Sequence, residues 1–222
     1  TSCYSGEQPV TIGETTTDSY GYLLPFNTES SYSYTQQIYM ASEMGSARSI
    51  DSIGFQYYNN TAQTRNVNIY MGHTQKTTFS GSNDWVPLSD LTLVYSGELA
   101  FNNSGNNYWF KIPLTTVFEY NGTDNLILAF DDNTGSYAYY NYNFYTHSIT
   151  GYSSMYSYSG GTNIDPSSPP SGDRISYRNN IWFSILCSEN TCDQTNVSAV
   201  EITDHSAKLV CSLGDGADGY EL

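Results

Sequence analysis

The residues best suited to chemistry in this chain follow its most apolar run. Asp131, Asp132 and Asn133 come directly after residues 125–130 (NLILAF), a run typical of a buried strand. Clustered carboxylate and amide oxygens are the ligands that Ca²⁺ prefers, so these three residues form a candidate calcium site. No complete calcium-loop motif follows them, and an Asx-rich turn that caps backbone N–H groups would use the same residues. The sequence leaves both interpretations open, and Ca²⁺ is the one cofactor that it suggests.

A tract rich in tyrosine follows this acidic cluster. Eight of the 22 tyrosines fall between Tyr137 and Tyr158. Tyrosine offers a flat apolar face and a hydroxyl group at a low cost in entropy, which suits contacts with sugar rings and with protein epitopes. Alternation along β-strands would instead turn about half of these side chains into a sandwich core. The ligand-binding residues that we expect are Tyr139, Tyr140, Tyr142, Tyr145, Tyr152 and Tyr156.

No ordered set of catalytic residues is evident in the sequence. The only histidines are His73, His147 and His205, and nothing resembles the strand–turn–helix motif of a serine nucleophile. No glycine-rich phosphate loop opens a helix. A pair of carboxylates, as in a glycosidase, can be drawn in many ways from 22 acidic residues, so a hydrolase stays open as a minor alternative. We expect a protein without enzymatic activity.

The charge balance disfavours two classes of partner. Seven basic and 22 acidic residues give a net charge of −15, which disfavours nucleic acids and anionic membrane surfaces because both attract basic proteins. Only 13% of the residues are charged, so the polarity comes from Ser, Thr, Asn, Gly and Tyr. This composition suits β-strands and extracellular loops, and no apolar run is long enough to span a bilayer.

The cysteines point to export without fixing their pairing. An even number, at Cys3, Cys187, Cys192 and Cys211, is compatible with disulfides in an exported protein. Three pairings are possible, and the sequence does not choose among them. The chain begins at Thr1 without Met, so we expect a processed or excised piece of a longer polypeptide with further domains.

The elements that would position these residues are short strands. Strand patterns occur at residues 31–39, 50–58, 65–71, 91–101, 108–112, 125–130 and 174–186. Their spacing of roughly 8–12 residues is typical of a sandwich. Pro113 should end the strand at 108–112, Asn121-Gly122 should form a turn, and residues 41–44 could form one helical turn. The residues expected to supply two inward faces are Val67, Ile69, Leu126, Leu128, Phe130, Ile181 and Phe183.

The pattern changes near residues 188–193. We therefore predict an all-β chain with an antiparallel, jelly-roll-like β-sandwich over residues 1–188. Residues 193–222 should form part of a second, smaller sandwich, with strands near 197–202, 207–211 and 219–222.

Three blocks of the sequence resemble one family. They are residues 34–44 (YTQQIYMASEM), residues 64–73 (TRNVNIYMGH) with the following Asp84-Trp85-Val86-Pro87, and residues 118–125 continuing through 131–135 (DDNTG). Together they resemble the β-sandwich modules of exported surface proteins from Bacteroidetes-type bacteria, which are related to the adhesin domains attached to secreted proteases. Residues 193–222 look like the start of a fibronectin type III domain, with Cys211 at the position of that family's strand-B tryptophan.

The resemblance implies a non-catalytic module that is extracellular or displayed on a bacterial cell surface. Such a module would bind a glycan or a host or cell-surface protein. The alternative that it implies is a structural spacer that accompanies a secreted protease or glycoside hydrolase. The family does not fix the ligand.

Overall fold

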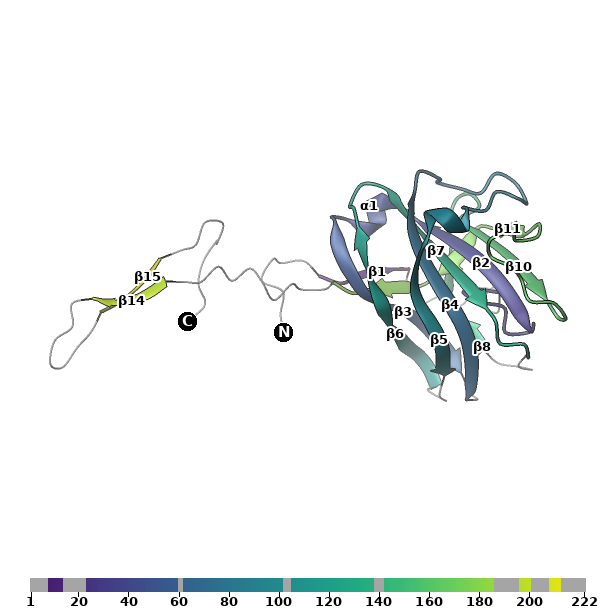
Figure 1. Ribbon diagram of the computed structural model, residues 1–222, viewed down its shortest axis with the longest axis horizontal. Coiled ribbons are helices and arrows are strands. Elements are labelled where there is room, and N and C mark those ends of the chain that lie inside the picture. Colours follow the sequence, from purple (N-terminus) through teal and green to yellow (C-terminus); the bar gives the residue numbers. More distant parts are fainter. Residues whose placement is uncertain are drawn as a thin grey trace. The chain divides into compact units, whose positions relative to one another are not determined.

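The computed structural model describes residues 8–13, 23–59, 62–101, 105–137, 142–185, 196–200 and 208–212 (Figure 1). The chain divides into two compact units, Thr1–Leu186 and Cys187–Leu222. The predicted change of pattern at residues 188–193 lies outside the described residues. So do Cys3, Cys187 and Cys192, which leaves the cysteine pairing a prediction.

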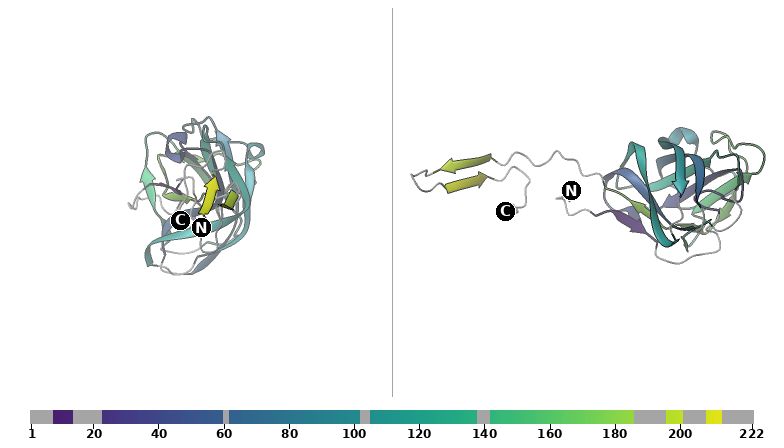
Figure 2. Two further views of the ribbon diagram at one scale, coloured as in Figure 1. Left: turned by 90° about the vertical axis from the view of Figure 1, so that its left-hand side faces the viewer. Right: turned by 90° about the horizontal axis from the view of Figure 1, so that it is seen from below.

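Two antiparallel sheets build the larger unit (Figures 1 and 2). In the first sheet the strand order is β1 (Val10–Ile12), β13 (Ile181–Phe183), β3 (Arg48–Asn59) and β6 (Gly105–Tyr120), and β8 (Tyr142–Phe144) also pairs with β3. In the second sheet the order is β11 (Asp173–Ile175), β10 (Ser154–Ser159), β2 (Tyr32–Tyr39), β7 (Asn125–Asp132), β4 (Gln63–Thr74) and β5 (Thr92–Phe101). A separate pair is formed by β9 (Thr146–Ser148) and β12 (Tyr177–Asn179).

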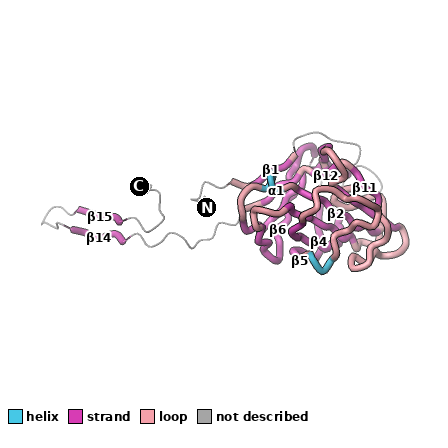
Figure 3. Tube along the Cα trace, turned by 90° about the horizontal axis from the view of Figure 1, so that it is seen from above, coloured by secondary structure: helices cyan, strands magenta, loops and turns pink. Residues whose placement is uncertain are grey.

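Helical structure among the described residues is limited to α1 (Ala41–Met44) and the short η1 (Leu88–Asp90) (Figure 3). No helix in this part of the chain is long and apolar enough to cross a membrane. The all-β, antiparallel prediction is therefore confirmed, whereas the jelly-roll topology stays a prediction.

The two sheets enclose one hydrophobic core. It is filled by alternate residues from both sheets, as the period-two pattern of a half-buried strand requires. The seven residues predicted to face inward are all buried. Aromatic rings join the sheets: Phe55 of β3 lies 5.4 Å from Phe130 of β7, and Phe183 of β13 lies 5.7 Å from Tyr39 of β2, measured between ring centroids.

Strand β7 is buried on both of its faces. Leu126, Leu128 and Phe130 enter the core between the sheets. On the outer face, Ile127 packs with Phe79 from the loop that leads from β4 to η1, and Ala129 packs with Ile164 from the loop that follows β10. Burial of both faces of β7 explains why residues 125–130 form a nearly continuous apolar run, as expected for a buried strand.

Two strand predictions were wrong. Residues 174–186 form three short strands rather than one, because this segment passes from the second sheet, through the pair with β9, into the first sheet. Pro113 does not end β6, which continues to Tyr120. The pairing of β6 with β3 shifts register between Ile50 and Ser52, opposite Phe118 and Pro113, and this irregularity accommodates a residue that cannot donate a ladder hydrogen bond.

In the smaller unit, β14 (Asn196–Val200) and β15 (Lys208–Ser212) pair antiparallel, with Val197 opposite Cys211. Their positions agree with the strands predicted near 197–202 and 207–211. The identification with a fibronectin type III domain stays a prediction.

Candidate functional site

The predicted metal ligands Asp131, Asp132 and Asn133 lie at the end of β7, but their side chains do not all point to the same face of the sheet. Asp131 and Asp132 belong to β7 itself, opposite Asn68 and Val67 of β4. Successive side chains of a strand point to opposite faces, so Asp132 points toward the core side and Asp131 toward the outer face of the second sheet. Asn133 stays with Asp131, since its Nδ2 donates to Asp131 Oδ2 at 2.8 Å. One ion cannot be shared by all three side chains in this arrangement.

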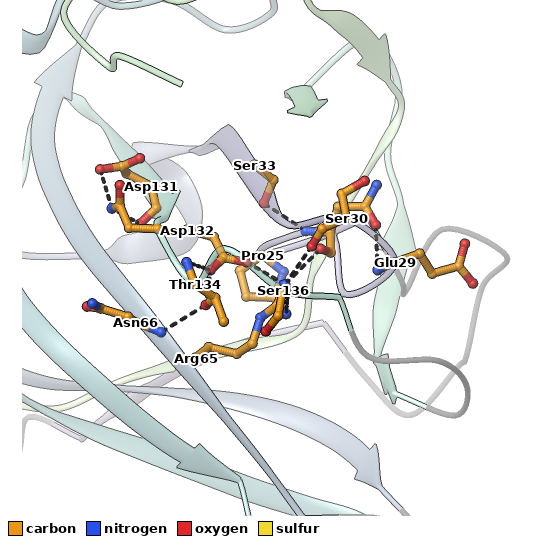
Figure 4. A network of polar contacts seen from close by, with 12 residues as sticks. Pro25, Glu29, Ser30, Ser33, Arg65, Asn66, Asp131, Asp132, Thr134 and Ser136 are labelled. Atoms are coloured by element: carbon orange, nitrogen blue, oxygen red, sulfur yellow. Dashed lines mark hydrogen bonds and ion pairs between the residues drawn. The ribbon is translucent and has the colours of Figure 1, made fainter. Parts of the chain in front are cut away.

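Asp132 is the acidic half of a buried ion pair (Figure 4). Its Oδ2 lies 2.5 Å from Nη2 of Arg65, and both side chains are at most 2% exposed. The backbone N–H and the hydroxyl of Thr134 both donate to Oδ1. Burial raises the pKa of Asp132, while Arg65 and Thr134 act in the opposite direction. With both oxygens occupied, Asp132 holds the structure together and is not free to bind a metal.

Arg65 connects β4 to two loops (Figure 4). Its Nη2 also donates to the backbone oxygens of Asn27 and Ser30, at 3.0 and 3.2 Å. Its Nη1 donates to the backbone oxygen of Ser136 at 2.9 Å. The guanidinium carbon lies 5.5 Å from the centre of the Phe26 ring. Arg65 therefore fixes the segment that leads into the tyrosine tract.

Asp131 is buried but only partly satisfied. Its Oδ2 accepts hydrogen bonds from Asn68 and Asn133, whereas its Oδ1 is buried and has no hydrogen-bond partner among the described residues. Burial raises the pKa of Asp131, and the negative charge of Asp165 adds to that effect. No group of three or more His, Cys, Asp or Glu side chains in the described ranges could hold a metal.

The predicted tyrosine site is divided by the structure. Tyr139 and Tyr140 lie outside the described residues, and of Tyr142 only the backbone, in β8, is described. Tyr145 is 9% exposed, and its backbone bonds to Gln56 and Asn180 hold it inside the larger unit. Tyr152 is 44% exposed. Of the five tract tyrosines whose side chains are described, only Tyr145 is buried, so the expectation that about half of the tract would be core stays a prediction.

The most exposed aromatic feature is a pair on β10. The rings of Tyr156 and Tyr158 are stacked, with centroids 6.2 Å apart and planes inclined by 4°. Tyr156 packs against Leu23, Leu24 and Ile175, while Tyr158 is 55% exposed. Tyr158 was not among the six predicted site residues. The spacing Tyr156-x-Tyr158 within a strand was the signal that could have included it, because residues two apart share a face.

This tyrosine pair lies at an edge of the second sheet. Strand β10 pairs with β2 along its whole length, but β11 pairs only with Ser154–Tyr156. Within the described part of the chain, residues 157–159 therefore have a neighbouring strand on one side only. Tyr152, in contrast, lies before β10, with the Arg174 guanidinium carbon 4.5 Å from its ring centre. Tyr158 lies six positions after Tyr152, about 20 Å along an extended chain, so the two do not form one small site.

A second aromatic candidate, which the sequence did not suggest, lies on the first sheet. Trp182 of β13 and Lys111 of β6 flank Gly54 of β3. The Lys111 ammonium lies 3.9 Å from the Trp182 ring centre. That face of the indole is occupied by a cation from the same chain, so it is less suited to a ligand than the tyrosine pair.

The polar network around Arg178 includes His147, a side chain of a type that acts as a general base in many enzymes. Nε of Arg178 donates to Nε2 of His147 at 3.0 Å, so Nδ1 of the ring carries the proton and donates to Asn180 Oδ1 at 2.9 Å. Both ring nitrogens of His147 are therefore engaged by groups that orient the ring. A general base needs one ring nitrogen directed at a substrate, and this geometry does not provide it.

Glu43 completes this network. Its Oε1 is ion-paired with Arg178, and its Oε2 accepts the backbone N–H of Met40 at 3.0 Å. Burial raises the pKa of Glu43, but the hydrogen bond and charge of Arg178 outweigh burial and hold that pKa below its usual value. Arg178 also donates to the backbone oxygen of Ile38. The network joins α1, β2, β9 and β12, and its contacts are internal.

The fold defines this chain only at the level of an antiparallel β-sandwich. Comparisons with protein-family models, curated proteins and solved structures found none that matches this chain.

Proposed function

We propose that this chain is a non-catalytic extracellular binding module of a larger exported bacterial protein. In this proposal it recognises a glycan or a cell-surface protein through the stacked pair Tyr156 and Tyr158. The observation that carries the proposal is a parallel pair of tyrosine rings at the open edge of a sheet, with Tyr158 55% exposed. The sequence resemblance to adhesin-like modules supports the same function.

Preorganisation supports a binding role for this pair. The two rings restrict each other, and Tyr156 is packed on three apolar side chains, so little side-chain freedom remains to be lost on binding. Rigid scaffolds that carry exposed aromatic side chains are common at recognition surfaces. No Lys or Arg occurs from Ser136 to Gly172, so recognition would depend little on salt.

The experiment is a glycan-array and cell-surface-protein screen with the whole chain, followed by titration of the best ligand. Tyr158→Ala should weaken binding by about five- to thirtyfold, since an aromatic hot spot contributes about 1–2 kcal/mol. Its melting temperature should change by no more than about 2 °C, because the side chain is largely exposed. Tyr137→Ala is the matched control, with 52% of that residue exposed, and should bind as the parent chain does.

The alternative is a structural spacer that accompanies a secreted protease or glycoside hydrolase. The observation that favours it is that the ion pairs of both buried arginines, Arg65 with Asp132 and Arg178 with Glu43, serve internal contacts. A chain that binds nothing in the screen, and in which Tyr158→Ala lowers the melting temperature as a core substitution would, supports the spacer and contradicts the binding proposal.

A further inference from the structure

The outer face of the second sheet contains a carboxylate that lacks compensation. Asp131 is 2% exposed, and both amide donors that reach it bind the same oxygen, Oδ2. Its Oδ1 is shielded from water with no hydrogen-bond partner in the described part of the chain. A buried carboxylate oxygen is costly unless a donor or a cation compensates it. None of the described residues supplies that compensation to Oδ1.

The loop that follows β10 brings a second carboxylate to this place. Nδ2 of Asn163 donates to Oδ1 of Asn133 at 2.5 Å, and Asn133 in turn bonds to Asp131. Ile164 packs on Ala129, which precedes Asp131 by two residues and shares its face of β7. The two residues that make these contacts directly precede Asp165 in the loop. The electrostatic effect of Asp165 on Asp131 agrees with this proximity.

The carboxylate of Asp165 is held in one orientation. Its Oδ1 accepts hydrogen bonds from the backbone N–H and the hydroxyl of Ser167, at 2.9 and 2.7 Å. No salt bridge to Asp131 or Asp165 occurs among the described residues. In a chain with a net charge of −15, two like charges held together in this way repel each other. A bound cation would remove the repulsion between Asp131 and Asp165, and it would also compensate the negative charge on Oδ1 of Asp131.

We propose that Asp131 and Asp165 hold a Ca²⁺ ion between β7 and the loop that follows β10. Side-chain amide oxygens of Asn133 or Asn163 and water would complete its coordination. Ca²⁺ fits this set better than Mg²⁺, because Ca²⁺ accepts an irregular set of carboxylate, amide and water oxygens, whereas Mg²⁺ demands near-ideal octahedral geometry. The site replaces the predicted ligand Asp132 with Asp165, a residue 33 positions further along the chain.

The position of this site has a consequence for the tyrosine pair. The loop that contains Asn163 and Asp165 begins directly after Tyr158 and Ser159. A cation that ties this loop to β7 would fix the end of the edge strand on which Tyr158 lies. The site does not depend on the proposed binding function, because its evidence is the unsatisfied oxygen and the loop contacts.

The test uses the whole chain after removal of metal with a chelator, and measures Ca²⁺ and Tb³⁺ binding. Tb³⁺ emission should be sensitised by aromatic residues near the site, since Trp85, Tyr34 and Tyr70 pack in the same cluster as Ile164. Ca²⁺ should displace Tb³⁺. With a dissociation constant of about 0.1–1 mM, as for weak extracellular sites, 10 mM CaCl₂ should raise the melting temperature by about 3–10 °C over NaCl of equal ionic strength.

Asp165→Asn separates the proposed site from general charge effects. Asp165 is exposed and its charge repels Asp131, so the metal-free variant should melt at or slightly above the temperature of the parent chain while its Ca²⁺ affinity falls at least tenfold. Asp173→Asn, an exposed aspartate of β11 in the same sheet, is the matched control and should keep its affinity within twofold. Asp131→Asn should abolish the Ca²⁺-dependent shift and, with chelator present, should raise the melting temperature because an uncompensated charge is gone.

Three outcomes would overturn the proposal. The first is a parent chain with neither sensitised Tb³⁺ emission nor a shift in melting temperature with Ca²⁺. The second is equal loss of affinity in Asp165→Asn and Asp173→Asn, which would mean diffuse screening of the net charge. The third is a full Ca²⁺ response in Asp165→Asn. If Asp131→Asn fails to fold, the Asp165→Asn comparison decides alone.

Discussion

Arg65 shows how one charged side chain can be placed inside a sandwich. It is 1% exposed, and its donors reach Asp132 and three backbone oxygens of two loops. A buried charge is tolerated where it is paired and its donors are used, and the cost appears when one partner is removed. No local pattern in the sequence indicates this role, because an arginine within a strand pattern is ordinarily assigned to the solvent face.

Arg65→Met should therefore destabilise the larger unit by about 3–5 kcal/mol, because Asp132 would stay buried without its partner. The double variant Arg65→Met with Asp132→Leu should lose less than the single variant, since it removes both charges. Urea unfolding at pH 7 measures the free energy of unfolding of the single and the double variant. Arg48→Met is the control: Arg48 bonds to backbone oxygens on the exposed surface, and its loss should cost less than about 1 kcal/mol. A loss of under 1 kcal/mol in Arg65→Met would contradict the role given to this ion pair.

Among the elements, the turn between β6 and β7 was fully predictable. Asn121-Gly122 joins the two strands, and Gly122 has a φ of 74°, a conformation that favours glycine. Asn121 Oδ1 accepts the backbone N–H groups of Thr123 and Asp124. The alternation of β7 and its two-sided burial were also evident from its residues. The pairing of each strand was not, because neighbours such as β10 and β2 are brought together from distant parts of the chain.

Gly122→Ala should destabilise the chain by about 2–4 kcal/mol. A Cβ at this position would lie 2.3 Å from the backbone nitrogen of Ala47, in addition to the strain of the positive φ. Gly160→Ala is the matched control, since a Cβ there would meet no atom within 4 Å and the glycine has no positive φ. Thermal unfolding followed by circular dichroism compares the two. Equal melting temperatures for both variants would show that the contact with Ala47 relaxes at no cost.

At the scale of the whole molecule, the sequence predicted what local patterns determine and missed what distant contacts determine. The all-β class and the inward faces follow from strand alternation, which needs only neighbouring residues. The division of Asp131 from Asp132 depends on how far β7 extends, and that is set by its partners β2 and β4. The Arg178 network joins residues 135 positions apart, from Glu43 to Arg178, and no local pattern could indicate it.

Stability toward acid should depend on Glu43. Its pKa is lowered in the folded chain, so its contribution is present above the usual carboxyl value of about 4.3 and is lost as the pH falls through the folded pKa. Relative to the parent chain, Glu43→Gln should lose about 1–2 kcal/mol of unfolding free energy at pH 7, and this loss should shrink as the pH falls below about 4.3 toward pH 3. Urea unfolding at both pH values checks this. Glu98→Gln, an exposed substitution on β5, should show no such difference, and a pH-independent loss in Glu43→Gln would contradict the assignment.

The central place of β7 also has a consequence for how the larger unit comes apart. It pairs with β2 on one side and β4 on the other, and both of its faces are covered. A short edge strand such as β1 can fray while the rest of its sheet stays paired, but β7 is released only when its neighbours and both covering layers separate. Its amide protons should therefore exchange with solvent only through global opening, whereas those of β1 exchange through local fluctuations. We therefore expect the larger unit to unfold cooperatively, with β7 among its most protected strands.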